Sequence, residues 1–191
     1  MATAIYGGSF NPFHQGHLAL GQWLVRKGLV DELWFMVSPQ NPLKPADGLL
    51  ADSVRLHLAR LAVGRRKGLR VSDFEFGLPR PSFMVDTLSA LREAYPECEF
   101  VLVVGADNWL DFSHWHKPDE ILRRHRLLVY PRPGYDLDEA SLPDGVQLVA
   151  TPLLDISSTQ IRQAIAADPA YDGAGLAPRV WAEIKRHHYY F

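Results

Sequence analysis

Short apolar runs rich in β-branched and aromatic residues alternate with longer segments of helical periodicity along this 191-residue chain. The runs are residues 2–6, 33–38, 69–76, 100–105, 126–132 and 146–151. Between several of them, apolar residues recur at helical spacing, over residues 16–28, 53–64 and 84–95. Strands of about four to eight residues that alternate with helices of about ten or more predict βαβ units and a parallel sheet.

The runs VLVV and WFMV are apolar at every position, which is typical of strands that helices cover on both faces of a sheet. We therefore expect an α/β fold, with a Rossmann-like, open, doubly wound and mostly parallel sheet and helices on both faces. No internal repeat or low-complexity linker interrupts the alternation. The sequence thus predicts a single domain over residues 1–191.

Charge and cysteine content exclude several classes of function. A formal net charge of -2 and a pI near 6.4 give no electrostatic case for nucleic-acid binding. The lone Cys98 excludes an internal disulfide and a cysteine-based zinc site. The N-terminus enters a strand-like run at once, and no apolar segment approaches the roughly 20 residues that span a bilayer. We expect a cytoplasmic protein with neither nucleic acid nor membrane as a partner.

The predicted fold also predicts where a ligand binds. In an open parallel sheet, ligands lie beyond the carboxyl ends of the strands. The segments in question are residues 7–17, 38–44 and 105–107, and the segment PLLDISSTQIR that follows the last run. Each of them holds polar or glycine residues, as the rule requires.

The first of these segments, GGSFNPFHQGHL, joins a strand directly to a helix that opens near Gln15. Gly7 and Gly8 allow the backbone to approach a ligand closely. The side chain of Asn11 is expected to bond the backbone just beyond it and so fix the turn. His14 and His17 are three residues apart, so both lie near one face at the helix start, where imidazoles and free N–H groups suit phosphate oxygens.

Other interpretations of this stretch remain open on the residues alone. Two glycines and a proline often form an ordinary turn, and a histidine pair at helical spacing is often only surface. A metal site is a third interpretation, although the stretch offers no third ligand, and our prediction for metal ligands is none. The stretch carries neither the dinucleotide fingerprint G-x-G-x-x-G nor the Walker pattern.

A second helix N-terminus that could bind phosphate is predicted in ISSTQIR. Ser157 with Gln160 three residues later fits a capping box, and a cap alone would explain both residues. The three consecutive hydroxyls and Arg162, however, add side-chain donors and a cation to the same helix end. Two such helix ends at one rim of a sheet favour a polyphosphate between them.

These two stretches together resemble the signatures of the nucleotidyltransferase superfamily with the H-x-G-H motif. Within it, the chain resembles the nicotinate mononucleotide adenylyltransferases of the bacterial type. The resemblance runs nearly end to end and includes NPLKP, PSFMVDTL, GADNWLDFSHWH and the terminal RHHYYF. The paired motifs are specific to the superfamily, and the middle segments indicate the branch.

The resemblance implies a reaction in NAD biosynthesis. The 5′-phosphate of nicotinate mononucleotide would attack the α-phosphorus of ATP in line, giving nicotinate adenine dinucleotide and pyrophosphate without a covalent intermediate. Positioning and charge stabilisation would supply the catalysis. Mg²⁺ would arrive with ATP, and the family's frequent self-association leaves open a homo-oligomer.

The resemblance also implies roles for matching residues. The catalytic set would be His14, His17, Lys44 and Arg162. The ATP-binding set would be Gly8, Ser9, Phe10, Gly105, Asp107, Ser157, Ser158 and Thr159. The mononucleotide-binding set would be Met84, Thr87, Trp115 and His116, with the Trp115 ring face-on to the pyridine ring.

The chain departs from the bacterial pattern at Ser9 and Asn11, where Thr and Asp are common, and at Met84, where a Thr often lies near the pyridine carboxylate. The first two keep the hydroxyl and the turn-capping group. Met84 weakens the case for nicotinate over nicotinamide, so an enzyme that uses both mononucleotides is one alternative. A phosphopantetheine adenylyltransferase and a non-catalytic nucleotide-binding module are the others. The first usually lacks the pairing of SF-x-x-DTL with HWH, and the second would be expected to have lost a phosphate contact.

Overall fold

The structure is a computed structural model that describes residues 1–39, 48–151 and 156–191. Its centre is a six-stranded sheet in the order β3-β2-β1-β4-β5-β6, with every neighbouring pair parallel. The strands are β1 (Ala2–Gly8), β2 (Glu32–Val37), β3 (Leu69–Ser72), β4 (Glu99–Gly105), β5 (Arg126–Tyr130) and β6 (Val146–Leu148). The predicted α/β, Rossmann-like sheet is confirmed, and the order reverses at β1, between β2 and β4.

Three strands end two or more residues earlier than the apolar runs predict. The run 69–76 leaves the sheet after Ser72 and continues as a 3₁₀ turn, η1 (Phe74–Gly77). The run 126–132 ends at Tyr130, because Pro131 has no N–H to continue the ladder. The run 146–151 pairs only through Leu148, and the chain then turns, with Thr151 N–H donating to the carbonyl of Val149 at 2.8 Å.

Helices connect the strands and complete the fold. They are α1 (Gln15–Arg26), α2 (Asp52–Val63), α3 (Met84–Ala94), α4 (Ala106–Leu110), α5 (Pro118–Arg124), α6 (Ser158–Ala167) and α7 (Pro178–His187), with further 3₁₀ turns η2 (Phe112–His114) and η3 (Glu139–Ser141). In the described part of the chain, no helix is both long and apolar enough to cross a membrane.

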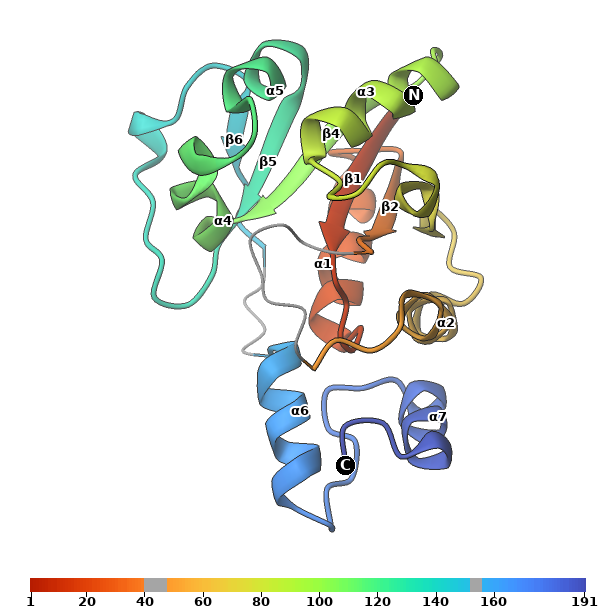
Figure 1. Ribbon diagram of the computed structural model, residues 1–191. Coiled ribbons are helices and arrows are strands. Elements are labelled where there is room, and N and C mark those ends of the chain that lie inside the picture. The colour runs from red at the N-terminus through yellow and green to blue at the C-terminus, as the bar shows by residue number, and fades with distance from the viewer. Residues whose placement is uncertain (40–47, 152–155) are drawn as a thin grey trace.

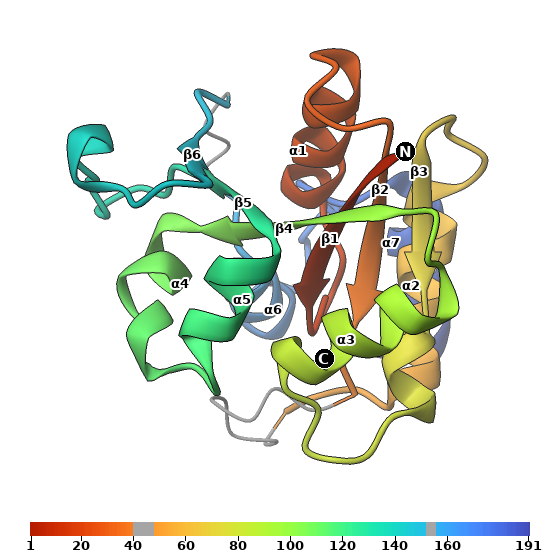
Figure 2. The ribbon, with the colours of Figure 1, turned by 90° about the horizontal axis from the view of Figure 1, so that it is seen from above.

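Two hydrophobic clusters cover the two faces of the sheet. Leu24 of α1, Leu58 of α2, Ile161 of α6 and Val180 of α7 belong to the first cluster. The second cluster contains residues of α3, α4 and α5, among them Leu88. Figure 2 shows α1 and α3 on opposite sides of the sheet. The sheet is therefore wound on both faces, as the alternation predicts.

Strand β1 feeds both clusters because successive side chains of a strand point to opposite faces. Ala4 and Tyr6 belong to the first cluster, and Ile5 between them belongs to the second. The arrowheads of β1 and β2 point toward the end of the molecule where α6 and α7 lie (Figure 1). That end collects the loops that follow the strands.

Candidate active site

Two hollows open at the carboxyl ends of the central strands. The larger is a cavity of about 480 Å³, and its lining includes Gly8, Ser9, Gly105, Met84, Trp115 and His116. The smaller is about 40 Å³, and its lining includes His14, His17, Arg132 and Ile156. Tyr6 lines both hollows, so they adjoin at the end of β1. The sheet thus offers one elongated site with two compartments.

The two histidines stack at the N-terminus of α1. His14 is the N-cap residue and His17 lies in the first turn, and their ring centroids are 3.6 Å apart. The backbone N–H of His14 donates to Nδ1 of His17 at 3.2 Å. An Nδ1 that accepts carries no proton, so the neutral His17 ring holds its proton on Nε2 and offers an N–H donor.

The glycine between these histidines is needed for the stacking. A Cβ built on Gly16 would lie 3.0 Å from both Cε1 and Nδ1 of His14. Such a contact is tighter than van der Waals packing allows without movement, so any other residue would displace the His14 ring. The H-x-G-H spacing therefore has a steric cause in this fold.

Both imidazoles are held neutral. Burial and, to a smaller extent, the charge of Arg132 lower the pKa of His14 from 6.5 to about 3. Burial, followed by His14 and Arg132, lowers the pKa of His17 well below its usual value. Among the described residues, Nδ1 of His14 is buried without a hydrogen-bond partner. The pair consequently presents donors and one unmet polar atom rather than positive charge.

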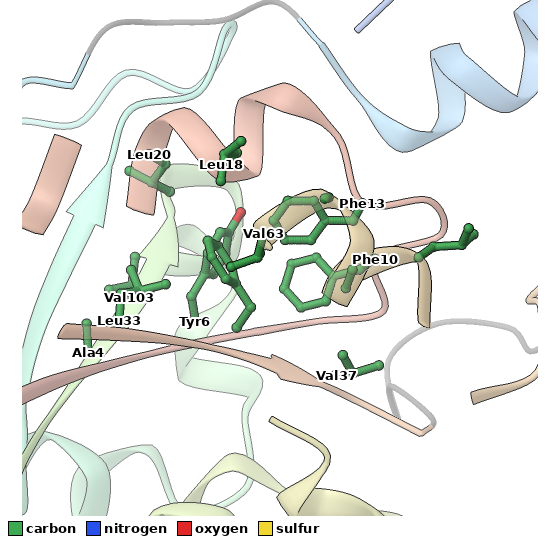
Figure 3. Close-up of a cluster of buried hydrophobic side chains, with 14 of the residues drawn as sticks. Ala4, Tyr6, Phe10, Phe13, Leu18, Leu20, Leu33, Val37, Val63 and Val103 are labelled. Atoms are coloured by element: carbon green, nitrogen blue, oxygen red, sulfur yellow. The ribbon is translucent and has the colours of Figure 1, made fainter. Parts of the chain in front are cut away.

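Two aromatic side chains of the core pack against the His17 ring. The Phe10 ring meets His17 edge-on with centroids 4.9 Å apart, and Phe13 lies 5.1 Å from the same ring. Figure 3 shows Phe10 and Phe13 side by side in the buried cluster that also contains Tyr6. Phe10 adopts a positive φ of 46°, an uncommon conformation for a side chain of this size. Its ring is buried in the core beneath the loop.

Helix α6 begins beside this loop, as the second motif predicts. Ser157 accepts from the Gln160 N–H at 3.1 Å, and Gln160 Oε1 accepts from the Ser157 N–H at 2.8 Å, which confirms the capping box. Ser158 Oγ donates to the carbonyl of Pro12 at 2.9 Å. Arg162 donates to the carbonyl of Asn11 at 2.8 Å. Hydrogen bonds therefore join the two predicted phosphate-binding helix ends.

The prediction for the Asn11 side chain is wrong in its range. The amide does not bond the backbone just beyond it; Nδ2 donates to the carbonyl of Gly48 at 2.9 Å, and Oδ1 accepts from Leu50 N–H at 3.3 Å. Oδ1 also accepts from the Tyr190 hydroxyl at 2.7 Å. The loop is therefore held by segments that are distant in the sequence.

Aromatic and thioether groups line the larger cavity. Met84 begins α3, and a Cβ on Gly7 would lie 2.8 Å from its Cε, so the glycine makes room for this methionine. The His116 ring packs on Phe83 with centroids 4.5 Å apart. Within the described residues, the Trp115 Nε1–H is buried and unpartnered. These surfaces suit a flat ring better than a charged chain.

A family model described as cytidylyltransferase-like matches residues 5–164. Curated relatives named "Probable nicotinate-nucleotide adenylyltransferase" include one from Bacteroides thetaiotaomicron. It is 48% identical over 189 residues, which is 98% of this chain and 92% of the relative. Another, from Cytophaga hutchinsonii, is 41% identical and covers 86% of each chain. The chain belongs to the cytidylyltransferase-like family, among its nicotinate-nucleotide adenylyltransferases.

Solved structures share this adenylyltransferase fold. Plasmodium falciparum nicotinic acid mononucleotide adenylyltransferase complexed with NaAD superposes with a TM-score of 0.84, covering 99% of this chain and 97% of that one at 19% identity. The same enzyme complexed with APC gives a TM-score of 0.83, also at 19% identity. At this identity the likeness concerns the fold.

Eight of the sixteen residues that the family motif indicates line the two hollows, and among the described residues Phe10, Thr87, Asp107, Ser157, Ser158, Thr159 and Arg162 line neither. Gly8, Ser9 and Gly105 line the larger one, and Asp107 forms an ion pair with Arg132 of the smaller one at 3.4 Å. Thr159 accepts from Arg162 at 3.3 Å. Thr87 does not line the cavity: its side chain is fully buried, and its hydroxyl donates to Glu75 at 2.9 Å. Lys44 lies outside the described residues, as do residues 152–155.

Sequence reasoning missed three charged residues: Arg132 and Glu75, which line the hollows, and Arg55, which bonds the backbone of the lining residues Ser9 and Ser38. Arg132 lies two residues beyond β5, so the strand-end rule that found the other segments also applies to it. Glu75 and Arg55 are buried, at 1% and 0% exposure, and their positions in the sequence carry no local signal. In the described residues, no group of three His, Cys, Asp or Glu side chains is arranged to hold a metal ion.

Proposed function

We propose that this protein joins nicotinate mononucleotide to the adenylyl group of ATP, giving nicotinate adenine dinucleotide and pyrophosphate in NAD biosynthesis. The observation that carries the proposal is the pair of compartments at one rim. Stacked neutral imidazoles line one compartment together with Ile156, which lies just before α6, and a ring-lined cavity forms the other compartment. The names of the curated relatives support the same reaction.

The reaction requires only transfer at phosphorus. An oxygen of the mononucleotide phosphate attacks the α-phosphorus of ATP, and the bond from that phosphorus to the bridging oxygen breaks, so that pyrophosphate leaves. No protein nucleophile and no net proton transfer is needed. The protein's task is to hold the two phosphates in line and to stabilise charge on the non-bridging oxygens.

The histidine pair is suited to that stabilisation. We assign Nε2–H of His17 as a donor to an oxygen on the α-phosphorus, because Nδ1 is already held by the backbone. His14, with a buried unpartnered Nδ1, would gain its missing partner from the nucleotide or from a water bound with it. The hydrogen bond from a neutral donor at this place becomes stronger as negative charge moves onto the phosphoryl oxygens in the transition state.

The leaving pyrophosphate would lie between the starts of α1 and α6. Arg162 bonds the loop carbonyl of Asn11 and the Thr159 hydroxyl, so its guanidinium is already fixed at this rim. Ser157 and Ser158 bring backbone and hydroxyl donors at the same helix end. Lys44 is proposed from its motif alone to add a second cation. Mg²⁺ would reach the site on the ATP phosphates.

The mononucleotide would occupy the larger cavity. The Trp115 indole would stack on the pyridine ring, with Met84 and His116 completing the ring pocket. Gly105 and Asp107, which belong to the ATP-binding set, lie at the end of β4, where they would contact the nucleotide sugar. A Cβ on Gly105 would meet the Asp107 carboxylate and lie 3.1 Å from the Tyr130 ring, so a larger residue at this position would displace these side chains.

A pyrophosphate-release assay tests the reaction directly. The purified protein is supplied with ATP and Mg²⁺ and with either nicotinate or nicotinamide mononucleotide, and the rates are compared. We expect a strong preference for nicotinate. Comparable rates would replace the proposal with a dual-specificity enzyme, and release with neither substrate would refute it in favour of a related transferase or a binding module.

Two wider features are also proposals. Residues 1–191 form one domain, because buried Val180 and Ile184 of α7 share a cluster with Ala4 of β1 and Phe35 of β2. The expected cytoplasmic location and the homo-oligomer left open by the sequence stay predictions, which cell fractionation and light scattering of the purified protein would check.

A further inference from the structure

One buried acid at the wall of the larger cavity has no part in the proposed transfer. Glu75, on the 3₁₀ turn η1, is 1% exposed and yet belongs to the cavity lining. A buried carboxylate is costly unless hydrogen bonds compensate its lost hydration. The contacts that compensate it show what it holds together.

Three hydroxyl groups donate to this carboxylate. Ser38 Oγ donates to Oε2 at 2.6 Å, and Ser82 Oγ reaches the same oxygen at 3.4 Å. Thr87 Oγ1 donates to Oε1 at 2.9 Å. The donors come from three different segments: the residue after β2, the loop before α3, and α3 itself. Glu75 therefore ties together three walls of one cavity.

Ser38 is held at its other end as well. Its carbonyl accepts from the fully buried Arg55 at 2.8 Å, while its hydroxyl bonds Glu75. Arg55 also donates to four further oxygens, those of Ser9 (2.6 Å), Pro39 (3.1 Å), Leu50 (2.9 Å) and the Asp52 carboxylate (2.7 Å). The exits of β1 and β2 are thereby fixed relative to each other, and Glu75 extends that connection to α3.

Among the described residues, the hydrogen-bond donors to this carboxylate are all neutral hydroxyl groups. In the part of the chain that the structure describes, Glu75 takes part in no ion pair, and Arg55 pairs with Asp52 instead. Burial raises the pKa of Glu75, and the bonds from Ser38, Thr87 and Ser82 oppose that rise. Glu75 therefore fixes the positions of these hydroxyl groups and of the backbone that carries them without the help of a cation.

We propose that Glu75 is a positioning residue for mononucleotide binding, acting through Ser38, Ser82 and Thr87 to set the spacing between the end of β2 and the start of α3. Met84, in the first turn of α3, forms part of the pyridine pocket and moves with this helix. The smaller hollow beside His14 and His17, where the transferring phosphates are placed, does not include Glu75 in its lining, whereas Gly8, Ser9 and Gly105 of the ATP-binding set share the larger cavity with Glu75. This inference rests on the proposed function, because it takes the larger cavity as the mononucleotide site.

The test compares substrates rather than overall activity. Glu75→Ala removes the carboxylate that accepts from Ser38, Ser82 and Thr87, and leaves Thr87 only its longer bond to the Phe83 carbonyl at 3.3 Å. We expect the KM for nicotinate mononucleotide to rise about tenfold or more while the KM for ATP stays within about twofold. Glu75→Gln keeps the shape and one acceptor oxygen, and hydroxyls can rotate to accept from the amide. It should restore the mononucleotide KM to within about threefold of the wild-type value.

Milder variants cover the case in which Glu75→Ala does not fold. Thr87→Val and Ser38→Ala each remove one hydroxyl bond, and each should raise the mononucleotide KM by about two- to fivefold without moving the ATP KM. Val180→Ala is the control, because it removes buried volume on the opposite face of the sheet and should lower thermal stability while leaving both KM values unchanged.

The outcomes separate this inference from the function it rests on. If the wild-type protein releases no pyrophosphate with either mononucleotide, the proposed function fails whatever Glu75 does. If the wild type turns over but Glu75→Ala raises both KM values equally, or changes only thermal stability as Val180→Ala does, the positioning role is refuted. A Glu75→Gln variant as impaired as Glu75→Ala would also refute it, because charge rather than placement would then be required. Calorimetric binding of the mononucleotide alone provides a second readout, with the same order of variants expected.

Discussion

The buried histidine pair should make the protein lose stability in mild acid. His14 is 4% exposed, and its pKa falls from 6.5 to about 3 on folding. The unfolded chain therefore binds a proton that the folded chain refuses, so this contribution is present above about pH 6.5 and is lost as the pH falls toward 3. His17, whose pKa burial lowers as well, acts in the same direction.

The magnitude follows from proton linkage. Between pH 7.5 and 5.5, protonation of the unfolded His14 costs the folded state about 1.4 kcal/mol, since each pH unit below the unfolded pKa costs about 1.4 kcal/mol. For a chain of this size, about 1 kcal/mol corresponds to roughly 2–4 °C in Tm. His14 alone should thus lower the Tm by about 3–6 °C over that range.

Thermal unfolding at the two pH values, followed by circular dichroism, measures this difference. His14→Asn removes the titrating ring and keeps a residue that caps helices well, so its Tm should fall less steeply with acid by about the amount given above. Val180→Ala, which lowers stability without removing a titrating group, should keep the wild-type pH slope. A His14→Asn slope equal to that of the wild type would show that the ring is not held neutral.

Three further perturbations address the site directly. His17→Ala should lower kcat by about 10²–10³-fold with the circular dichroism spectrum unchanged, because its contact belongs to the transition state; near-normal turnover would exclude the assigned role. Gly16→Ala places a Cβ 3.0 Å from the His14 ring and should lower kcat about tenfold or more, measured by pyrophosphate release, whereas unchanged kcat would mean that the stacking is dispensable. Trp115→Ala should weaken mononucleotide binding more than ATP binding in calorimetry, and an equal loss for both would contradict stacking on the pyridine ring.

The fold could be predicted because its signals are local. Each strand is a short apolar run, each major helix repeats apolar residues at helical spacing, and the strand-end rule then identifies the loops at the active rim. The capping box of α6 was predictable for the same reason, since Ser157 and Gln160 are three residues apart. His14 and His17 share a helix face by spacing alone.

What the sequence could not show are contacts between distant segments. The residues next to Asn11 in the sequence do not indicate that its side chain forms hydrogen bonds with Gly48, Leu50 and Tyr190. Thr87 belongs to a motif segment, and the motif suggests a contact with the mononucleotide. Its hydroxyl instead bonds Glu75, which lies on another element. Arg55 looks like an ordinary solvated residue of an amphipathic helix, and only the packed loops around it show why it is buried. Such residues can be recognised only once the fold is known, because folding brings their partners next to them.

The bond between Tyr190 and Asn11 also bears on how the chain is made. It joins residues 179 positions apart, and the contacts of Ser158 with Pro12 and Arg162 with Asn11 span 146 and 151 positions. The loop that carries the histidines is therefore synthesised early, whereas the residues that hydrogen-bond to it are synthesised late. During translation the strands of the sheet can pair before α6 and α7 are made, so we expect this loop to reach its final conformation only when the last segments pack onto the core.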